Sequence, residues 1–354
     1  MDEKKYYSIP GISNSTLTYF KVSPLYCWKR MNHEIAEIEK SYTFLGKQLH
    51  LSLLEPEEFE KNYIYLDFKT PTSKQQLEFC EYVVTADKML ETNEVLKMAY
   101  AHAYASMGRS EKTILQSAEK IYESNSEYIK YLQLRGDYRE VLSKSRKELI
   151  TTITQAIKSH KKANSLMFTD FLSNDNIKEF NEFPVFWNYP ISVNDELLKC
   201  KSLIDRLVVD HTNKKVTIVD LKTTSTLGDI TVQIDDRNYY RQLAFYRLAV
   251  QHSQIIPNDY EIEAYIVAVN TQDPFECRVY KLSEAEYQKQ LLVINELMKE
   301  ISWHWFTNQW DYSRTYYEGD GTENLNDEYS NKSIERTGYD GSDTLRAADA
   351  IFEG

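Results

Sequence analysis

The sequence predicts an α/β protein with a small mixed central sheet flanked by helices, a helical insertion and an acidic C-terminal tail. Helical spacing of apolar residues dominates up to about Phe171, and the period changes beyond Asn176. The runs that follow are short, rich in β-branched and aromatic residues, and later alternate with helical segments. This order is typical of a mixed α/β domain.

The N-terminal region predicts two short helices before Tyr42. A cluster of Ser and Asn at residues 12–15 can cap a helix that runs to Val22, and Pro24 begins the next one.

A longer helix is expected next, because Leu45 and Leu49 recur on one face, and Pro56 marks its end. His50 lies inside this mostly buried helix. From about residue 72 to 171 the pattern is helical nearly throughout, which indicates a helical layer or insertion.

Strands are expected next, at residues 183–187, 189–193, 197–209 and 215–224. The turn at 210–215 makes the last two a hairpin. A helix over 235–252, strands over 261–271 and 276–282, and a closing helix over 283–306 follow. Ser283 and Glu286 have the spacing of a capping box for that last helix.

Charge is distributed unevenly along the 354 residues. The net charge of −12 argues at first sight against a phosphate-rich partner. However, residues 311–354 hold 11 acidic and 4 basic residues, which leaves −5 for the preceding 310. We therefore expect one domain over 1–310 and a disordered acidic tail over 311–354, with a partner-binding peptide as the alternative for the tail.

Neither a membrane segment nor a disulfide framework is predicted. No apolar run approaches the roughly 20 residues that cross a bilayer, and the first residues lack a secretory signal, so a cytoplasmic protein is expected. Cys27, Cys80, Cys200 and Cys277 are widely separated and form no CxxC pair, so free thiols are expected.

The strand expected over 215–224 carries Asp220 and Lys222 near its end. Side chains at i and i+2 project from the same face of a strand, so a carboxylate and an ammonium lie side by side. The alternative is a solvated ion pair.

The preceding strand contains a second acid, Asp205, within an apolar run. A buried carboxylate needs cationic compensation, and the hairpin can bring Asp205 near Asp220. Two carboxylates beside Lys222 form a hard-oxygen site for Mg²⁺ or Mn²⁺. The alternative is a structural salt bridge from Asp205 to Arg206 or Lys222.

Gln242 and Tyr246 share one face of the next helix, because they are spaced i and i+4. A Gln on an inward face needs a polar partner, and that face can point toward Asp205 and Asp220.

Taken together, these motifs resemble the PD-(D/E)XK nuclease superfamily. The motif residues, in chain order, are His50 in GKQLH, Glu182 in NEFPVFW, Asp205 in SLIDRL, Asp220 and Lys222 in VDLKTT, and Gln242 and Tyr246 in RQLAFYR. Within the superfamily the chain is most similar to the exodeoxyribonuclease V nuclease domain and the exodeoxyribonuclease VIII type of phage recombination exonuclease. The segment ISNSTLTYFKVSPLYCWKRM resembles the opening of the same branch. The resemblance covers roughly residues 10 to 285 and implies a restriction-endonuclease-like core.

The resemblance also implies roles for individual residues. Asp205, Asp220 and the carbonyl of Leu221 correspond to metal ligands, and His50 to the histidine that joins them. Lys222 corresponds to the catalytic lysine and Glu182 to the acid of the first motif. Gln242 and Tyr246 match the motif associated with holding substrate.

The function implied is a Mg²⁺- or Mn²⁺-dependent DNA exonuclease acting on linear double-stranded ends in recombination or repair. Implied partners are DNA and a single-strand annealing protein, with a homo-oligomer left open, in a bacterial host cytoplasm if phage-encoded. No iron-sulfur cluster is expected, because the cysteines lack its grouping. The alternative is a non-catalytic nucleic-acid or protein binding module on the same scaffold.

Two further groups of residues are candidate DNA contacts. One is a basic track, with an exposed helix face as its alternative: Lys144, Arg146, Lys147, Lys158, Lys161 and Lys162. The other is a set of aromatic residues that could stack bases, although core packing is more usual there: Trp303, Trp305, Phe306 and Trp310.

Overall fold

The computed structural model describes residues 3–35, 41–87, 89–104, 108–168, 176–193, 196–225, 234, 237–253, 255–257 and 259–322. The chain divides into two compact units. The first comprises Met1–Glu55 and Ile153–Gly354, and the second comprises Pro56–Thr152. Each unit is described by itself below.

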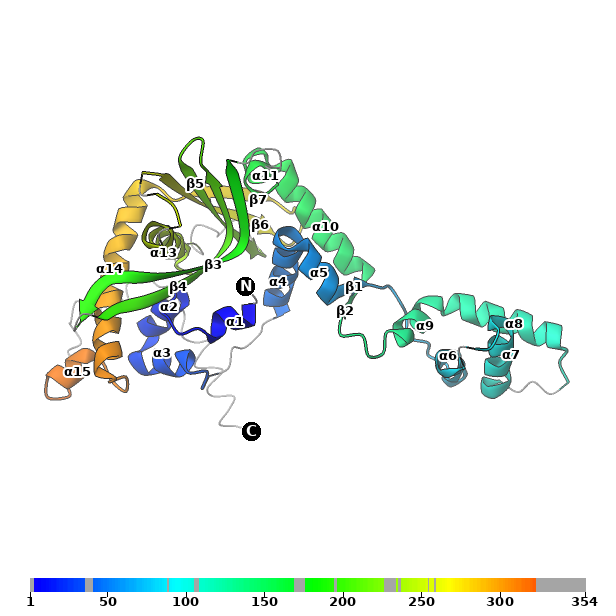
Figure 1. Cartoon of the computed structure of the whole chain (residues 1–354). Coiled ribbons are helices and arrows are strands. Elements are labelled where there is room, and N and C mark those ends of the chain that lie inside the picture. Colours follow the sequence, from blue (N-terminus) through cyan, green and yellow to red (C-terminus); the bar gives the residue numbers. More distant parts are fainter. Residues whose placement is uncertain are drawn as a thin grey trace. The chain divides into compact units, whose positions relative to one another are not determined.

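A five-stranded mixed sheet forms the centre of the first unit, as the sequence predicted (Figure 1). Its strands are β3 (Ile177–Val193), β4 (Glu196–Asp210), β5 (Lys215–Thr224), β6 (Glu261–Asn270) and β7 (Cys277–Lys281). They lie in the order β3-β4-β5-β6-β7. Only β5 and β6 pair in parallel, and the other neighbours pair antiparallel.

The hairpin of β4 and β5 has the predicted antiparallel pairing, with Arg206 opposite Val219 and Asp210 opposite Lys215. The two separate strands expected before it are instead the single long strand β3. Pro184 and Pro190 lie within β3, which is an edge strand, where a missing backbone donor is tolerated.

Helices cover both faces of this sheet. On one face α13 (Tyr239–His252) packs against β3, β4, β5 and β6, and α14 (Glu284–Thr307) packs beside it. Ala264 and Ile266 belong to the core on that face. The ring of Tyr265, between them in β6, lies 4.7 Å from Nζ of Lys162 in α11 (Lys161–Met167) on the other face.

The closing helix confirms half of the predicted capping box. Ser283 Oγ accepts a hydrogen bond from the Glu286 N–H at 3.2 Å, whereas the Glu286 carboxylate accepts from Gln290. Beyond this helix, Trp310 is buried in the core and Phe306 packs against it, so these two aromatic residues have the packing role. A short helix, α15 (Arg314–Glu318), follows within the segment expected to be disordered. The remainder of the predicted tail, 323–354, lies outside the described residues.

Three helices, one more than predicted, precede Tyr42 in the described part of the chain: α1 (Glu3–Ser8), α2 (Asn14–Val22) and α3 (Pro24–Met31). The predicted cap is present, because Ser13 and Thr16 form a capping box at the start of α2. The next helix, α4 (Ser41–Leu54), ends just before Pro56 and contacts β4 and β5.

The ribbon of β3 and β4 changes its buried face part-way along. In β4 the core residues are even-numbered up to Ile204 and odd-numbered from Leu207 onward. Because side chains alternate between the faces of a strand, this switch marks a local distortion around Asp205. Glu182 stands at the corresponding place in β3, between the pairs Asn181 with Arg206 and Phe183 with Ile204. Its φ is +43°, a left-handed conformation that is uncommon for a non-glycine residue.

The second unit is mainly helical, as the spacing predicted, with α5 (Pro56–Asn62), α6 (Lys74–Thr85), α7 (Thr92–Ala103), α8 (Glu111–Ser124) and α9 (Ser126–Gln133). It has its own apolar core, centred on buried residues such as Phe79, Ile129 and Leu132. Two short strands, β1 (Tyr63–Tyr65) and β2 (Glu140–Leu142), pair in parallel and were not predicted. The helix α10 (Lys144–Ser159) then leads from this unit into the first.

Across the described residues, none of the helices combines the length and the apolar character that a bilayer crossing requires.

Candidate metal centre

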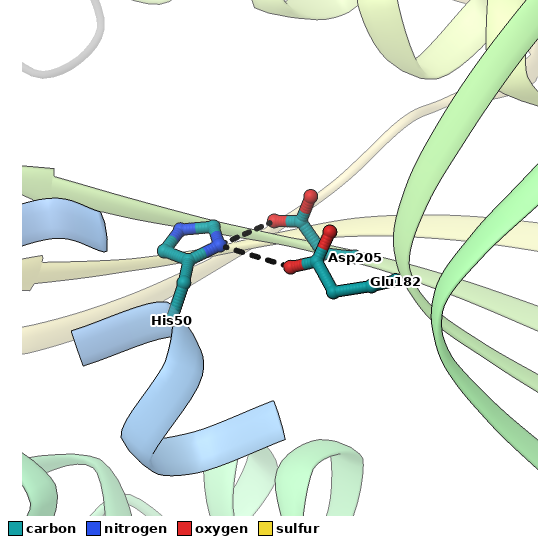
Figure 2. A group of neighbouring side chains, drawn as sticks. All are labelled: His50, Glu182 and Asp205. Carbon is teal, nitrogen blue, oxygen red and sulfur yellow. Dashed lines mark ion pairs between the residues drawn. The ribbon is translucent and has the colours of Figure 1, made fainter. Parts of the chain in front are cut away.

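Three predicted site residues from distant parts of the chain converge in the first unit. His50 Nδ1 lies 3.6 Å from Glu182 Oε1 and 3.6 Å from Asp205 Oδ2. Figure 2 shows the imidazole reaching from its helix toward the two carboxylates, which come from neighbouring strands. One potential ligand atom from each residue lies within 4.8 Å of the other two. A nitrogen and two carboxylate oxygens at this spacing can hold one divalent cation.

Helix α4 delivers His50 through a close approach to β5. A Cβ placed on Gly46 would lie 3.3 Å from Thr223 Oγ1, which is tighter than ordinary packing. Gly46 is one helical turn before His50, so both residues face the sheet. The glycine therefore lets α4 bring the imidazole up to the strand.

The backbone of β5 fixes the orientation of the imidazole. His50 Nε2 lies 2.9 Å from the carbonyl oxygen of Leu221. A carbonyl can only accept, so Nε2 carries the proton and Nδ1 is the nitrogen directed at the carboxylates. This is the arrangement by which proteins orient a ligating histidine. The predicted Leu221 carbonyl is thus at the site, in contact with His50.

Asp205 is held by the same strand. Its Oδ2 accepts a hydrogen bond from the backbone N–H of Leu221 at 2.8 Å. The alternative salt bridge to Arg206 is not formed, because the Arg206 guanidinium binds Glu179 at 2.8 Å instead. Among the described residues, Asp205 has no arginine partner, and it faces His50.

Asp220 and Lys222 form the pair that their spacing predicted. Lys222 Nζ lies 3.0 Å from Asp220 Oδ1 and 2.8 Å from Oδ2. Asp220 is fully buried. The ammonium also lies 4.9 Å from the centre of the Tyr239 ring, a cation–π distance.

The expected Gln and Tyr pair on α13 is also present. Gln242 Nε2 donates to Tyr246 Oη at 2.8 Å, which supplies a polar partner for the half-buried amide. Burial raises the pKa of Tyr246 well above its usual value, and the charges of Asp220 and Asp205 act in the same direction. The hydroxyl therefore lies within electrostatic reach of both acids.

The pKa values of the cluster report a strongly negative site. Burial alone would lower the pKa of His50, yet Asp205 and Glu182 outweigh it and raise the pKa to about 9. Burial raises the pKa of Asp220 to about 6, even though Lys222 opposes the shift. A site that favours imidazolium and resists two ionised acids is one that a divalent cation would stabilise, with release of a proton.

Three features of the site escaped the sequence patterns. The role of Gly46 depends on a close approach that spacing does not reveal. Tyr239 could have been found, because it shares the helical face of Gln242 and Tyr246 at i, i+3 and i+7. The left-handed conformation of Glu182 left no signal in the sequence.

The N-terminal motif packs onto the helix that carries Gln242. The buried Arg241 donates from Nε to Asn14 Oδ1 at 3.0 Å and from Nη2 to Thr18 Oγ1 at 2.6 Å. The opening segment of the resemblance therefore fastens α2 to α13.

Comparison with known families supports the same reading. Residues 194–313 match a family model described as a PDDEXK-like domain of unknown function. The matched segment is therefore similar to a PDDEXK-like domain. It contains Asp205, Asp220, Lys222, Gln242 and Tyr246, whereas His50 and Glu182 lie before it. The match supports the PD-(D/E)XK nuclease superfamily without distinguishing an exodeoxyribonuclease VIII type.

Other comparisons add little to the PDDEXK-like segment. No curated protein matches the chain. Among solved structures, a protein from Eubacterium rectale described as a "Putative exonuclease" matches with a TM-score of 0.45 and 11% identity, covering 85% of each chain. The structure of SSO0001 matches with a TM-score of 0.26 and 12% identity, covering 73% of this chain and 85% of that one.

Proposed function

We propose that this protein is a divalent-metal-dependent deoxyribonuclease that hydrolyses linear double-stranded DNA from its ends. The observation that carries the proposal is the convergence of His50, Glu182 and Asp205 beside the Asp220–Lys222 pair. These groups come from α4, β3, β4 and β5, and the fold accepts a left-handed residue and two buried acids to assemble them.

The donor set suits Mg²⁺ or Mn²⁺. Carboxylate oxygens are the ligands that these hard cations prefer, and the imidazole favours Mn²⁺ among the two. When bound, such a cation supplies a coordinated water at neutral pH and offsets the negative charge of the phosphate. This local cation also reconciles the acidic chain with a polyanionic substrate.

Each residue then has a distinct task. Asp205 and Glu182, with His50 Nδ1, hold the cation, and the Leu221 carbonyl keeps the imidazole in place. Asp220, beside them, adds the further oxygen ligand that the resemblance implies. The ammonium of Lys222 orients the attacking water and stabilises charge that develops on the scissile phosphate. Gln242 and Tyr246 line the approach from α13 and hold the substrate strand.

The exposed lysines of α10 and α11 can contact the DNA backbone. Lys144, Lys147 and Lys158 recur along α10 at spacings that keep them on one side of the helix, and all are exposed. Phosphate contacts of this kind give affinity without sequence preference. A role in recombination or repair, an annealing-protein partner and self-assembly stay predictions.

The first test replaces Lys222 with Ala. The expected result is loss of hydrolysis of end-labelled linear duplex by about 10²-fold or more, because the removed ammonium acts mainly in the transition state. Mn²⁺ binding, followed by calorimetry, should change little. The matched control is Lys199→Ala, which removes an exposed lysine from the same sheet.

Assays that vary the DNA substrate and the metal distinguish a nuclease from a non-catalytic binding module. A nuclease acting from ends degrades linear duplex, spares covalently closed circles and stops on chelation. A binding module gives mobility shifts but no products with either substrate. Undiminished cleavage by Lys222→Ala, or the absence of any cleavage with Mg²⁺ and Mn²⁺, would overturn the proposal.

A further inference from the structure

The ring of Tyr239 lies against the ammonium of Lys222. The ring centre is 4.9 Å from Nζ, while both oxygens of Asp220 lie within 3.0 Å of the same atom. The ammonium is thus enclosed by one carboxylate and one aromatic face. In the described part of the chain, no second acid forms an ion pair with it.

The position of Tyr239 is set by the backbone at the start of α13. Tyr239 is the first residue of α13, and it follows Asn238, whose φ of +56° turns the chain sharply into the helix. Its ring is half-buried against the core, so its position is set by packing. Helical spacing aligns it with Gln242 and Tyr246, which makes one stripe of three residues facing the site.

A catalytic lysine needs a second contact of this kind if its ammonium is to stay in one position. Its four-carbon stem has about 2 kcal/mol of rotamer entropy to lose, and a single partner leaves the ammonium free to rotate around that partner. A second carboxylate would neutralise the charge that the reaction uses. An aromatic face attracts a cation without neutralising it or accepting its proton.

We propose that Tyr239 is a positioning residue that holds the Lys222 ammonium in its working geometry through the face of its ring. The inference rests on the proposed nuclease function for its catalytic consequence, but the contact itself is independent of activity. The ring, not the hydroxyl, carries the effect. Among the described residues, the hydroxyl accepts a hydrogen bond from the Arg237 guanidinium, at 3.4 Å, near the surface.

Three variants separate the ring from the hydroxyl and from general destabilisation. Tyr239→Leu removes the ring and keeps apolar bulk. Tyr239→Phe keeps the ring and removes the hydroxyl. Tyr240→Leu is the matched control, because Tyr240 is the next residue of α13, is also half-buried and packs against the same core, yet points about 100° away around the helix.

Single-turnover cleavage of linear duplex with Mg²⁺ is the first readout. Tyr239→Leu should be about five- to thirtyfold slower, the range expected for loss of one partly buried cation–π contact. Duplex affinity, measured with Ca²⁺, should stay within twofold, since the ammonium is still present. Tyr239→Phe should recover the rate to within about twofold of the wild type.

Chemical labelling gives a readout that does not need activity. In the full chain without metal or DNA, an amine-specific reagent followed by mass spectrometry reports how accessible Lys222 is. Labelling of Lys222 relative to the exposed Lys199 should rise several-fold in Tyr239→Leu and remain near wild type in Tyr239→Phe and Tyr240→Leu.

The outcomes distinguish the two hypotheses. If the wild type cleaves nothing, the nuclease proposal fails, while the labelling pattern still decides whether Tyr239 restrains Lys222. Unchanged labelling in Tyr239→Leu overturns the positioning role. Equal loss of rate in Tyr239→Phe and Tyr239→Leu would assign the effect to the hydroxyl, and equal effects of Tyr240→Leu and Tyr239→Leu would assign it to destabilised packing; either result also overturns the proposal.

Discussion

Glu182 illustrates how one residue can carry both backbone strain and chemistry. Its φ of +43° in the middle of β3 is unfavourable for any residue with a Cβ, yet this conformation directs the carboxylate to His50. The strain is tolerated because β3 pairs with β4 on both sides of the residue, so the neighbouring ladder fixes the backbone. The cost is local, and the gain is a ligand that an undistorted strand would aim elsewhere.

The strain at Glu182 predicts that a glycine variant is more stable than an alanine variant at this position, the reverse of the usual order. Both Glu182→Gly and Glu182→Ala remove the carboxylate, but only glycine relieves the left-handed backbone. We expect Glu182→Gly to be more stable than Glu182→Ala by about 1 kcal/mol. Urea unfolding of the metal-free variants measures this difference.

The control for Glu182 is Asn188, an exposed residue of the same strand without a positive φ. There the ordinary order should hold, with Asn188→Ala more stable than Asn188→Gly by about 0.5–1 kcal/mol. If alanine is more stable than glycine at both positions, the backbone at Glu182 is not strained in solution.

At the scale of elements, Glu263 ties three strands together at the face opposite the main core. Its carboxylate, 11% exposed, contacts Lys215 of β5 at 2.6 Å, Lys281 of β7 and the hydroxyl of Tyr265. Burial alone would raise the pKa of Glu263, but the hydrogen bonds from Lys215 and Lys281 lower it from 4.5 to about 2.

This depressed pKa predicts a defined pH window for the sheet. A carboxylate whose pKa is lower in the folded state stabilises the fold above about pH 4.5, and that stability is lost as the pH falls toward 2. With screening of the partly exposed lysines, we expect Glu263→Gln to lower the free energy of unfolding by about 1–2 kcal/mol at pH 6. The difference between the two proteins should shrink steadily below pH 4.

Urea titrations between pH 3 and 7 test the role of Glu263. Glu276→Gln is the control, because its carboxylate is half exposed and contacts only Arg278 among the described residues. That variant should differ from the wild type by less than about 0.5 kcal/mol at every pH. A Glu263→Gln difference that does not vary with pH would rule out the linkage.

The elements also show what the sequence could predict. The β4–β5 hairpin, the Asp220–Lys222 pair and the Gln242–Tyr246 contact were predictable, because each depends on short-range periodicity of a strand or a helix. The distortion at Asp205 and Glu182 was not, because it arises between two paired strands. The β1–β2 pairing joins residues about 77 positions apart, and local patterns contain no information on such a contact. His50 and Glu182 were placed only through the resemblance.

At the scale of the whole molecule, the helical unit interrupts the sequence of the site. His50 precedes Pro56–Thr152 in the chain and Glu182 follows it, so the insertion separates two of the three clustered residues. The family match over 194–313 contains the acids of β4 and β5 but neither of those residues. Loops at the surface of a compact unit tolerate long insertions, because the cost of closing a loop grows slowly with its length.

The two units have separate apolar cores, which predicts that each unit unfolds in a transition of its own. The main core is built only from residues of the first unit, and the core around Ile129 only from residues of the second. We expect two transitions in calorimetry of the full chain. Ile218→Ala and Ile129→Ala each remove a side chain that is at least 99% buried, so each should destabilise its own unit by about 2–5 kcal/mol.

The pattern of shifts decides whether the two units are thermodynamically independent. Ile129→Ala should lower only the transition of the helical unit, and DNA cleavage at 25 °C should persist, since the site lies in the other unit. Ile218→Ala should lower only the transition temperature of the first unit, which contains the sheet. The temperature at which cleavage is lost should fall with it. A single transition that both variants shift equally would mean that the units fold as one cooperative body, and the insertion would then be part of what holds the site together.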